Sequence, residues 1–136
     1  MPNHIPFDQE KADKQIQSGG LSAGTIKAKA KHYSYFEKYV TDEGLTMEAL
    51  LDDTEQLQEL LIQYYTTFRV IGDKLPTKSY IDNSKSHVKT TILEKTKGMI
   101  DISNAAVFPR FYKAWKAIEV ELKAAGRGKI IATYFF

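Results

Sequence analysis

Apolar residues recur along this chain with the spacing of α-helices rather than of β-strands. In residues 22–42, successive apolar positions are separated by four, three, three and four residues: Ile26, Ala30, Tyr33, Phe36 and Val40. This spacing puts one apolar stripe on a helix of 3.6 residues per turn. Ser22 is a preferred N-cap residue, and Gly44 is of the type preferred just beyond a C-terminus. The pattern predicts a first helix that starts near Ser22 and ends at about Asp42.

Two more helices are predicted on either side of a loop at residues 70–76. The second follows Asp53, a good N-cap residue, with a short extra turn ahead of it at residues 47–51. Its apolar stripe consists of Leu57, Leu60, Leu61, Tyr64 and Phe68. The third helix is predicted to start after Thr77 or Ser79 and to reach about Lys97, with Gly98 as its stop. Its apolar side is thin, with only Tyr80, Ile81, Val88 and Ile92.

The fourth helix has the clearest apolar stripe of the chain. We expect it to begin around Phe108 and Pro109, since proline is tolerated at the first helical position, and to end at Gly126. The stripe consists of Phe111, Tyr112, Trp115, Ile118 and Leu122. Amphipathic helices with connections of moderate length predict an all-α domain over residues 21–129, a compact bundle of four or five helices.

The two ends of the chain lack this pattern. Residues 1–20 are polar and close with Ser18, Gly19 and Gly20, so we expect a flexible or loosely docked N-terminal arm. Residues 130–136 (IIATYFF) are apolar and short, and we expect a strand or an extended tail there. The sequence shows no internal repeat and no second domain.

Charge is distributed unevenly along the chain. Residues 1–70 hold 7 Lys and Arg against 11 Asp and Glu, a net charge of −4, whereas residues 71–136 hold 12 against 6, a net charge of +6. Such asymmetry indicates a polyanionic partner, with a merely solvated surface as the plain alternative. Between Asp42 and Glu59 there are seven acidic residues and no Lys or Arg, so this stretch should repel a phosphate backbone.

Lysines gather on the first and third predicted helices. Lys27 and Lys31 lie on one side of the first helix. On the third, at about 100° per residue, three lysines fall within about 40° of one another: Lys78, Lys85 and Lys89. Asp82 lies in the same row and weakens it.

Residues for catalysis or metal binding do not gather in the sequence. The chain has no cysteine, and His4, His32 and His87 are scattered, with no partner at metal-ligand spacing. Neither a glycine-rich phosphate loop nor a nucleophile elbow occurs. We therefore expect no enzyme activity, cofactor, metal or small-molecule substrate, and we expect each histidine to be a surface or half-buried side chain.

The sequence also indicates the cellular compartment of the protein. Residues 1–8 contain neither the basic nor the apolar region of a signal peptide, and no run reaches the ~18 apolar residues of a membrane span. We expect an intracellular protein that does not contact a membrane.

Taken in order, the segments resemble a known family. The first helix carries TIKAKAKHYSYF (residues 25–36), the second ends in LIQYYTTFR (61–69), and the loop GDKLP (72–76) leads into TKSYI (77–81). The last helix, FPRFYKAWKAIEVELKAAGRG (108–128), is the most distinctive segment. Over residues 22–129 the chain resembles the N-terminal core-binding domain of tyrosine recombinases, a SAM-like helical domain, which implies an orthogonal arrangement of the bundle. The resemblance is strongest to eukaryotic crypton-type transposable elements and to host proteins domesticated from them.

The resemblance implies the DNA-binding, non-catalytic half of a protein of DNA recombination or integration. The family carries its chemistry in a separate C-terminal domain with an HxxR-type motif and a nucleophilic Tyr, whereas here Phe7, Tyr35 and Thr90 stand three residues after the histidines. We expect that a catalytic domain is missing after residue 136 and that the chain alone does not cleave DNA. Core-binding domains form half of a clamp around duplex DNA. The resemblance thus implies sequence-tolerant binding of double-stranded DNA, in the nucleus, by a domain that is monomeric in isolation.

By this analogy, the residues that contact DNA come from the first and third helices and from the exit of the fourth. The candidates are Lys27, Lys31, Thr77, Lys78, Ser79, Lys85, Lys89, Arg127 and Lys129. Lysines would contact phosphates as point charges, and hydroxyl groups near Thr77 would fix the register.

A second reading of the chain is a helical protein–protein interaction module of a domesticated, transposon-derived protein. It would use the acidic stretch at residues 42–59 or the aromatic residues near Phe136. The sequence leaves open both this choice and whether the parent protein is an active mobile element or a domesticated host protein.

Overall fold

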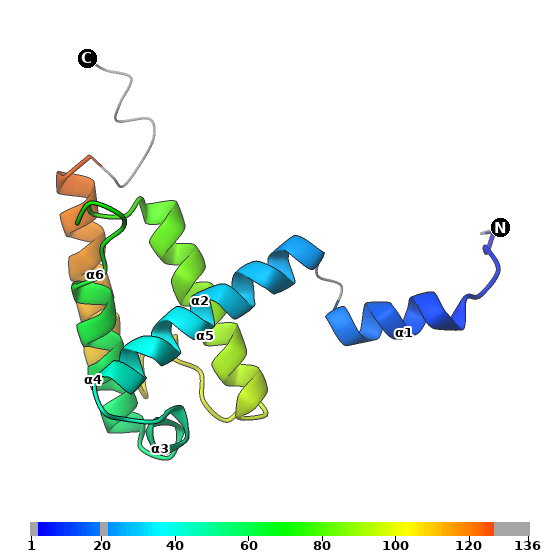
Figure 1. The fold of residues 1–136 in the computed structure, drawn as a ribbon, viewed down its shortest axis with the longest axis horizontal. Coiled ribbons are helices and arrows are strands. Elements are labelled where there is room, and N and C mark those ends of the chain that lie inside the picture. Colours follow the sequence, from blue (N-terminus) through cyan, green and yellow to red (C-terminus); the bar gives the residue numbers. More distant parts are fainter. Residues whose placement is uncertain (1–2, 20–21, 127–136) are drawn as a thin grey trace.

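The computed structural model describes residues 3–19 and 22–126, and these residues form an all-α fold (Figure 1). Their helices are α1 (Gln9–Ser18), α2 (Ala23–Asp42), α3 (Met47–Leu51), α4 (Thr54–Thr66), α5 (Lys78–Lys95) and α6 (Pro109–Ala124). The described residues contain no strand, only an isolated bridge between Val70 and Lys74. None of their helices has the length and apolar character needed to cross a membrane. The all-α prediction is confirmed.

The helix boundaries follow local signals that the sequence carries. The Ser22 hydroxyl accepts a hydrogen bond from the Thr25 amide at 3.1 Å, and the Asp53 carboxylate accepts one from the Gln56 amide at 3.2 Å. Thr77 caps α5 in the same way. The predicted starts of α2, α4 and α5 are confirmed, as is the short turn α3. These starts could be predicted because each cap acts within a few residues of the sequence. Helix α5 ends two residues before the predicted Lys97, and α4 ends before Phe68.

Helix α1 lies within residues 1–20, where a flexible or loosely docked arm is expected and where no helix is predicted. The Asp8 carboxylate caps its start by accepting from the Lys11 amide at 3.1 Å, and Gly19 ends it with a positive φ of 62°. Between these ends, Gln9 donates to Asp13 at 2.8 Å. Short-range contacts of this kind stabilise a helix without an apolar stripe. The described side chains of α1 are exposed, apart from a half-buried Ala12.

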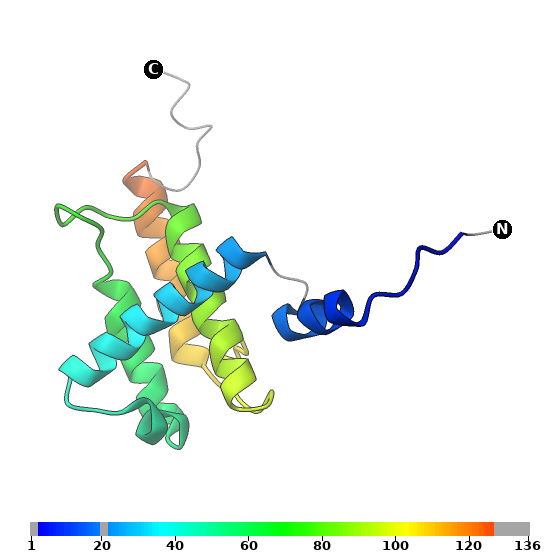
Figure 2. The ribbon, with the colours of Figure 1, turned by 45° about the vertical axis from the view of Figure 1, so that its right-hand side comes forward.

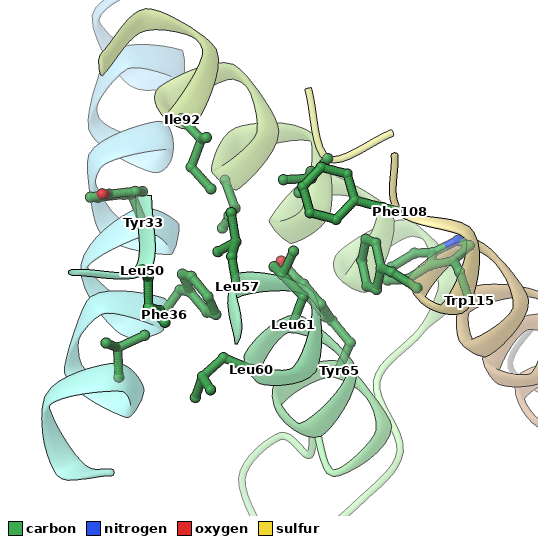
Figure 3. Packing of buried hydrophobic residues seen from close by; sticks show 14 of the residues in the cluster. Tyr33, Phe36, Leu50, Leu57, Leu60, Leu61, Tyr65, Ile92, Phe108 and Trp115 are labelled. Carbon is green, nitrogen blue, oxygen red and sulfur yellow. The ribbon is translucent and has the colours of Figure 1, made fainter. Parts of the chain in front are cut away.

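The core forms where α2 packs across α5 and α4 lies along α6 (Figures 1 and 2). Large side chains from these four helices and from α3 fill it, and Figure 3 shows Phe36, Leu50, Leu57, Leu61, Tyr65, Ile92 and Trp115. Phe111 of α6 belongs to the same buried cluster. Ile102 and Phe108, which lie between α5 and α6, are also buried. The predicted stripes therefore supply most of the core.

Three residues of the predicted stripes are exposed to solvent. Tyr112 is 50% exposed, and Ile26 and Ala30 are exposed in the first half of α2. A stripe wider than the surface it packs against leaves its edge in solvent, and sequence spacing does not reveal where the partner helix ends.

Candidate nucleic-acid interface

Helix α5 has four sides with different surroundings. Ile81, Ser84, Val88 and Ile92 are buried in the core. The side that bears Lys78 and Lys85 faces α6, since both side chains contact residues of that helix. The side that bears His87 faces α2, because its ring stacks on His32. The remaining side carries Ser79, Asn83, Ser86 and Thr90, which lie within about 60° of one another at 100° per residue.

We call these four residues the polar strip. Ser79, Asn83 and Ser86 are exposed and Thr90 is half-buried. All four are uncharged and carry groups that donate and accept hydrogen bonds. The strip was not predicted as a unit, although its spacing of four, three and four residues is visible in the sequence.

Lys78 is engaged within the protein. Its ammonium lies 2.7 Å from Asp82 and 3.2 Å from Glu119 of α6. The hydrogen bond to Asp82 raises the pKa of Lys78 more than any other influence, and the bond to Glu119 raises it further. Asp82 was expected to weaken the lysine row, and the structure adds Glu119 as a second carboxylate at the same ammonium.

Lys85 is also turned toward α6. Its ammonium lies 4.4 Å from the centroid of the Trp115 ring and 5.7 Å from that of Phe111, a cation–π arrangement. Burial is the main cause that lowers its pKa. The Lys85 side chain therefore covers the edge of the core, and its ammonium also adds positive charge to the surface.

Lys89 lies one turn beyond Lys85 and is half-buried. Within the described residues no carboxylate forms an ion pair with it. Of the three lysines in the predicted row, Lys89 has the ammonium most available to an outside anion.

Both carboxylates of α5 are neutralised by lysines. Asp82 pairs with Lys78, and Glu94 pairs at 2.6 Å with Lys29 of α2, whose side chain is only 16% exposed. No acidic side chain of α5 is therefore left to repel a phosphate approaching the polar strip.

The first half of α2, a helix that packs across α5, carries exposed positive charge. Lys27 and Lys31 are exposed, and neither forms an ion pair within the described part of the chain. No Asp or Glu occurs between Ala23 and Phe36.

The remaining predicted residues lie at the ends of helices. The Thr77 hydroxyl caps α5 by accepting from the Tyr80 amide at 3.2 Å, and Ser79 is exposed in the first turn. Arg127 and Lys129 lie outside the described residues.

A pair of stacked histidines, which the sequence did not predict, joins α2 to α5. The rings of His32 and His87 stack with centroids 5.4 Å apart, and Tyr80 meets His32 edge-on at 5.4 Å. His32 is buried, so the expectation of a surface or half-buried ring is wrong for this residue, while His87 is half-buried. No local signal could reveal a pair 55 positions apart in the chain.

Burial lowers the pKa of both histidines. For His32, the charges of His87 and Lys31 lower the pKa further, and for His87 the charge of Lys29 does. Nδ1 of His32 is buried without a hydrogen-bond partner. Among the described residues, no three His, Cys, Asp or Glu side chains gather as metal ligands would.

Comparison of this chain with family models, with curated proteins and with solved structures finds no match. Function is therefore inferred from the geometry of the described residues.

Proposed function

We propose that this chain binds double-stranded DNA without strong sequence preference, through the polar strip of α5 together with lysines of α2 and α5. It acts as a binding module and not as a catalyst. One observation carries the proposal: α5 exposes a row of uncharged hydrogen-bonding side chains, while each carboxylate on the helix is paired with a lysine.

This arrangement suits a duplex for two reasons. Ser, Thr and Asn side chains commonly contact phosphate and sugar oxygens, which positions a protein on DNA without reading its sequence. Lys27, Lys31 and Lys89 have ammonium groups free of ion pairs within the described chain, and such groups attract the phosphate backbone.

The resemblance to tyrosine recombinases supports the same function. We propose that α2 to α6 form a SAM-like orthogonal bundle equivalent to a core-binding domain, and that the protein works on DNA in the nucleus. The helix order agrees with that family in placing a basic helix after a short loop and before the FPRFYKAWKA segment. The sequence has no HxxR motif, which is why the proposed role is binding alone.

The salt dependence of duplex binding tests this proposal. Fluorescence anisotropy with a short labelled duplex of mixed sequence would give the dissociation constant at several salt concentrations. The salt slope is that of the logarithm of the binding constant against the logarithm of the salt concentration. A double variant, Lys27→Ala with Lys89→Ala, should flatten this salt slope by about 2 if each lysine contacts one phosphate. The matched control is Lys113→Ala with Lys123→Ala, which removes two exposed charges from α6 and should leave the slope within about 0.5 of the parent.

Two results would contradict the proposal. One is the absence of duplex binding at about 50 mM salt, where non-specific DNA binding is strong. The other is an equal loss of slope in both double variants, which would show a general charge effect without a contact surface on α2 and α5.

A further inference from the structure

A hollow of about 770 Å³ lies between α2, the end of α4 and the connection from α4 to α5. This volume is within the ~300–1,000 Å³ usual for ligand pockets. Five aromatic residues from these elements and from the first turn of α5 line it: Tyr35, Tyr39, Tyr64, Phe68 and Tyr80. The hollow is not part of the polar strip, and the resemblance to tyrosine recombinases assigns no role to it.

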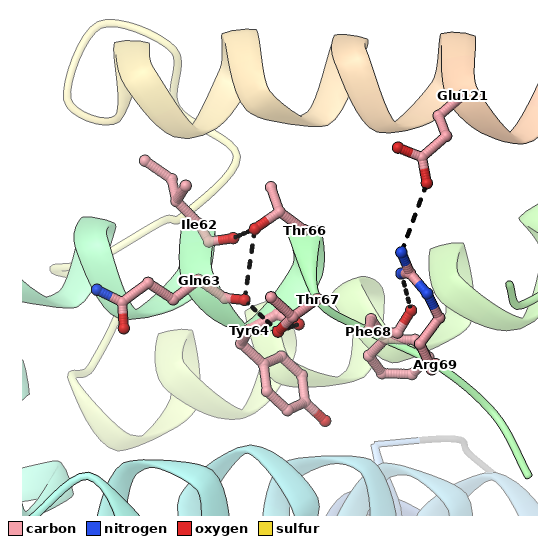
Figure 4. A network of polar contacts seen from close by, with 8 residues as sticks. All are labelled: Ile62, Gln63, Tyr64, Thr66, Thr67, Phe68, Arg69 and Glu121. Atoms are coloured by element: carbon pink, nitrogen blue, oxygen red, sulfur yellow. Dashed lines mark hydrogen bonds and ion pairs between the residues drawn. The ribbon is translucent and has the colours of Figure 1, made fainter. Parts of the chain in front are cut away.

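Tyr64 is the centre of the aromatic lining. Its ring meets Tyr39 at 5.3 Å and Phe68 at 5.5 Å, both edge-on, and Figure 4 shows it pointing from α4 toward α2. Burial raises the pKa of Tyr64 far above its ordinary value, and the nearby phenols of Tyr80 and Tyr35 raise it further. The phenols of Tyr80 on α5 and Tyr35 on α2 therefore lie close enough to Tyr64 to affect its pKa. Tyr35 is the most accessible of them, since 47% of it is exposed.

Positive charge surrounds this lining. Lys31, Lys38 and Arg69 line the hollow, with Asp42 as the one carboxylate. Asp42 is paired with Lys38 at 2.9 Å, so no carboxylate of the lining pairs with Lys31 or Arg69.

Arg69 is held in place by its neighbours. One guanidinium nitrogen donates to the Phe68 carbonyl at 2.7 Å, and another lies 3.8 Å from Glu121 (Figure 4). The contact with Glu121 is long and exposed, so an anion in the hollow can compete for this guanidinium.

We propose that this hollow binds unpaired nucleotides of a single-stranded nucleic acid, with a base against Tyr35 and Tyr80 and the backbone phosphates near Lys31 and Arg69. Aromatic rings combined with cations are the usual means of holding single strands, because every base has a face that stacks. The site is distinct from the polar strip, and the inference does not depend on duplex binding by α5. The lining favours a nucleotide over an acidic peptide, since a peptide carboxylate would use the cations but not the five rings.

A matched pair of tyrosine variants tests the hollow. Tyr35 is 47% exposed on α2, and Tyr112 is 50% exposed on α6 and is not part of the hollow. The probe is a fluorescein-labelled oligo(dT) strand of about eight nucleotides, within the range that single-strand-binding folds cover. Binding to the full chain is followed by anisotropy at low salt, and circular dichroism checks that each variant is folded.

The expected results separate stacking from charge. Tyr35→Ala should weaken oligo(dT) binding by about 5- to 100-fold, whereas Tyr112→Ala should change it by less than about twofold. Tyr35→Phe keeps the ring and should bind as the parent does, which also guards against a loss caused by misfolding. Lys31→Gln should flatten the salt slope for oligo(dT) by about 0.7, the value for one single-strand phosphate.

Three results would overturn the inference. The parent could fail to bind oligo(dT) at low salt, the two alanine variants could lose affinity equally, or an oligo-glutamate peptide of similar length could bind more tightly than oligo(dT). Binding of a short duplex is measured alongside and should be the same for Tyr35→Ala and the parent. If duplex binding is absent while the Tyr35 effect persists, the proposed function fails and the hollow stands. If duplex binding persists without oligo(dT) binding, the inference about the hollow fails and the proposed function stands.

Discussion

Trp115 connects the core to the surface of α5. Its ring packs against Tyr65 at 5.3 Å and Phe111 at 6.0 Å, and on another side the Lys85 ammonium lies 4.4 Å from its centroid. The sequence spacing predicted a core residue here, and the side chain is 6% exposed. The spacing could not predict the lysine above the ring, because that contact depends on how α5 packs beside α6.

Replacing Trp115 with Ala should therefore be costly. The loss of a buried aromatic side chain and the cavity it leaves should lower the free energy of unfolding by about 3–5 kcal/mol. Tyr112→Ala, at the half-exposed position three residues earlier, should cost less than about 1 kcal/mol. Urea denaturation of both variants measures the difference, and similar values would show that Trp115 is not a core residue.

The His32 and His87 pair should make stability depend on pH. Both pKa values lie below the ordinary value of 6.5 in the folded chain. The unfolded chain therefore takes up protons first as the pH falls. The stabilising effect of the neutral pair is fully present above the ordinary histidine pKa of 6.5 and is lost as the pH falls through the lowered pKa values of the folded chain.

Thermal unfolding across this range checks the pH prediction. His87→Gln should reduce the decrease in melting temperature between about pH 7 and about pH 5, whereas His4→Gln, which alters an exposed histidine, should not. A parent chain that is equally stable at both pH values would contradict the role given to the pair.

At the scale of elements, the start of α6 depends on a distant residue. Phe108 precedes the helix and offers no capping side chain. Instead, the side-chain oxygen of Gln58 on α4 accepts from the amides of Arg110 at 2.9 Å and Phe111 at 3.1 Å. Arg110 also forms an ion pair with Glu59. The two helices are thus joined by hydrogen bonds as well as by apolar packing.

Gln58→Leu should leave these two amides without a protein partner. Because Gln58 is buried, water cannot fully replace its oxygen, and the expected loss of unfolding free energy is about 1–3 kcal/mol. Gln58→Glu keeps the acceptor and adds a negative charge at a helix N-terminus, so it should retain most of the stability. Equal losses for both variants in urea denaturation would show that side-chain packing, and not the cap, is what matters.

The elements differ in how well their sequences predict them. Caps such as Ser22, Asp53 and Thr77 act within four residues, so the starts of α2, α4 and α5 could be predicted. Helix α1 was missed because its signals are polar and it lacks an apolar stripe. The Gln58 cap spans more than 50 residues, and no local pattern reveals such a contact.

At the scale of the molecule, the use of each lysine depends on packing between helices. The sequence predicted that Lys78, Lys85 and Lys89 share a side of α5, and the contacts of Lys78 and Lys85 with α6 agree with that. What each ammonium contacts could not be predicted, because Glu119 and Trp115 come from α6. The hollow beside α2 is likewise built from residues far apart in the sequence, whose convergence appears only in the folded chain.

Releasing Lys78 should strengthen duplex binding. In a double variant, Asp82→Asn with Glu119→Gln, the Lys78 ammonium loses both carboxylates and becomes available to a phosphate. The salt slope of duplex binding should steepen by about 1. Glu48→Gln with Glu55→Gln removes two charges from the acidic stretch as a control and should alter the slope by less than about 0.5. An identical effect of both double variants would show that only net charge matters.

Duplex binding by the polar strip of α5 can be tested by mapping the backbone amides that respond to DNA. Two-dimensional NMR spectra of the ¹⁵N-labelled chain, recorded while a short duplex is added at about 50 mM salt, report on each residue separately. Duplex binding through the polar strip should give the largest shifts at Ser79, Asn83 and Ser86 on α5, smaller ones near Lys27 and Lys31, and little change in the acidic stretch at residues 42–59. Shifts confined to α6 or to the acidic stretch, or none at all, would contradict it.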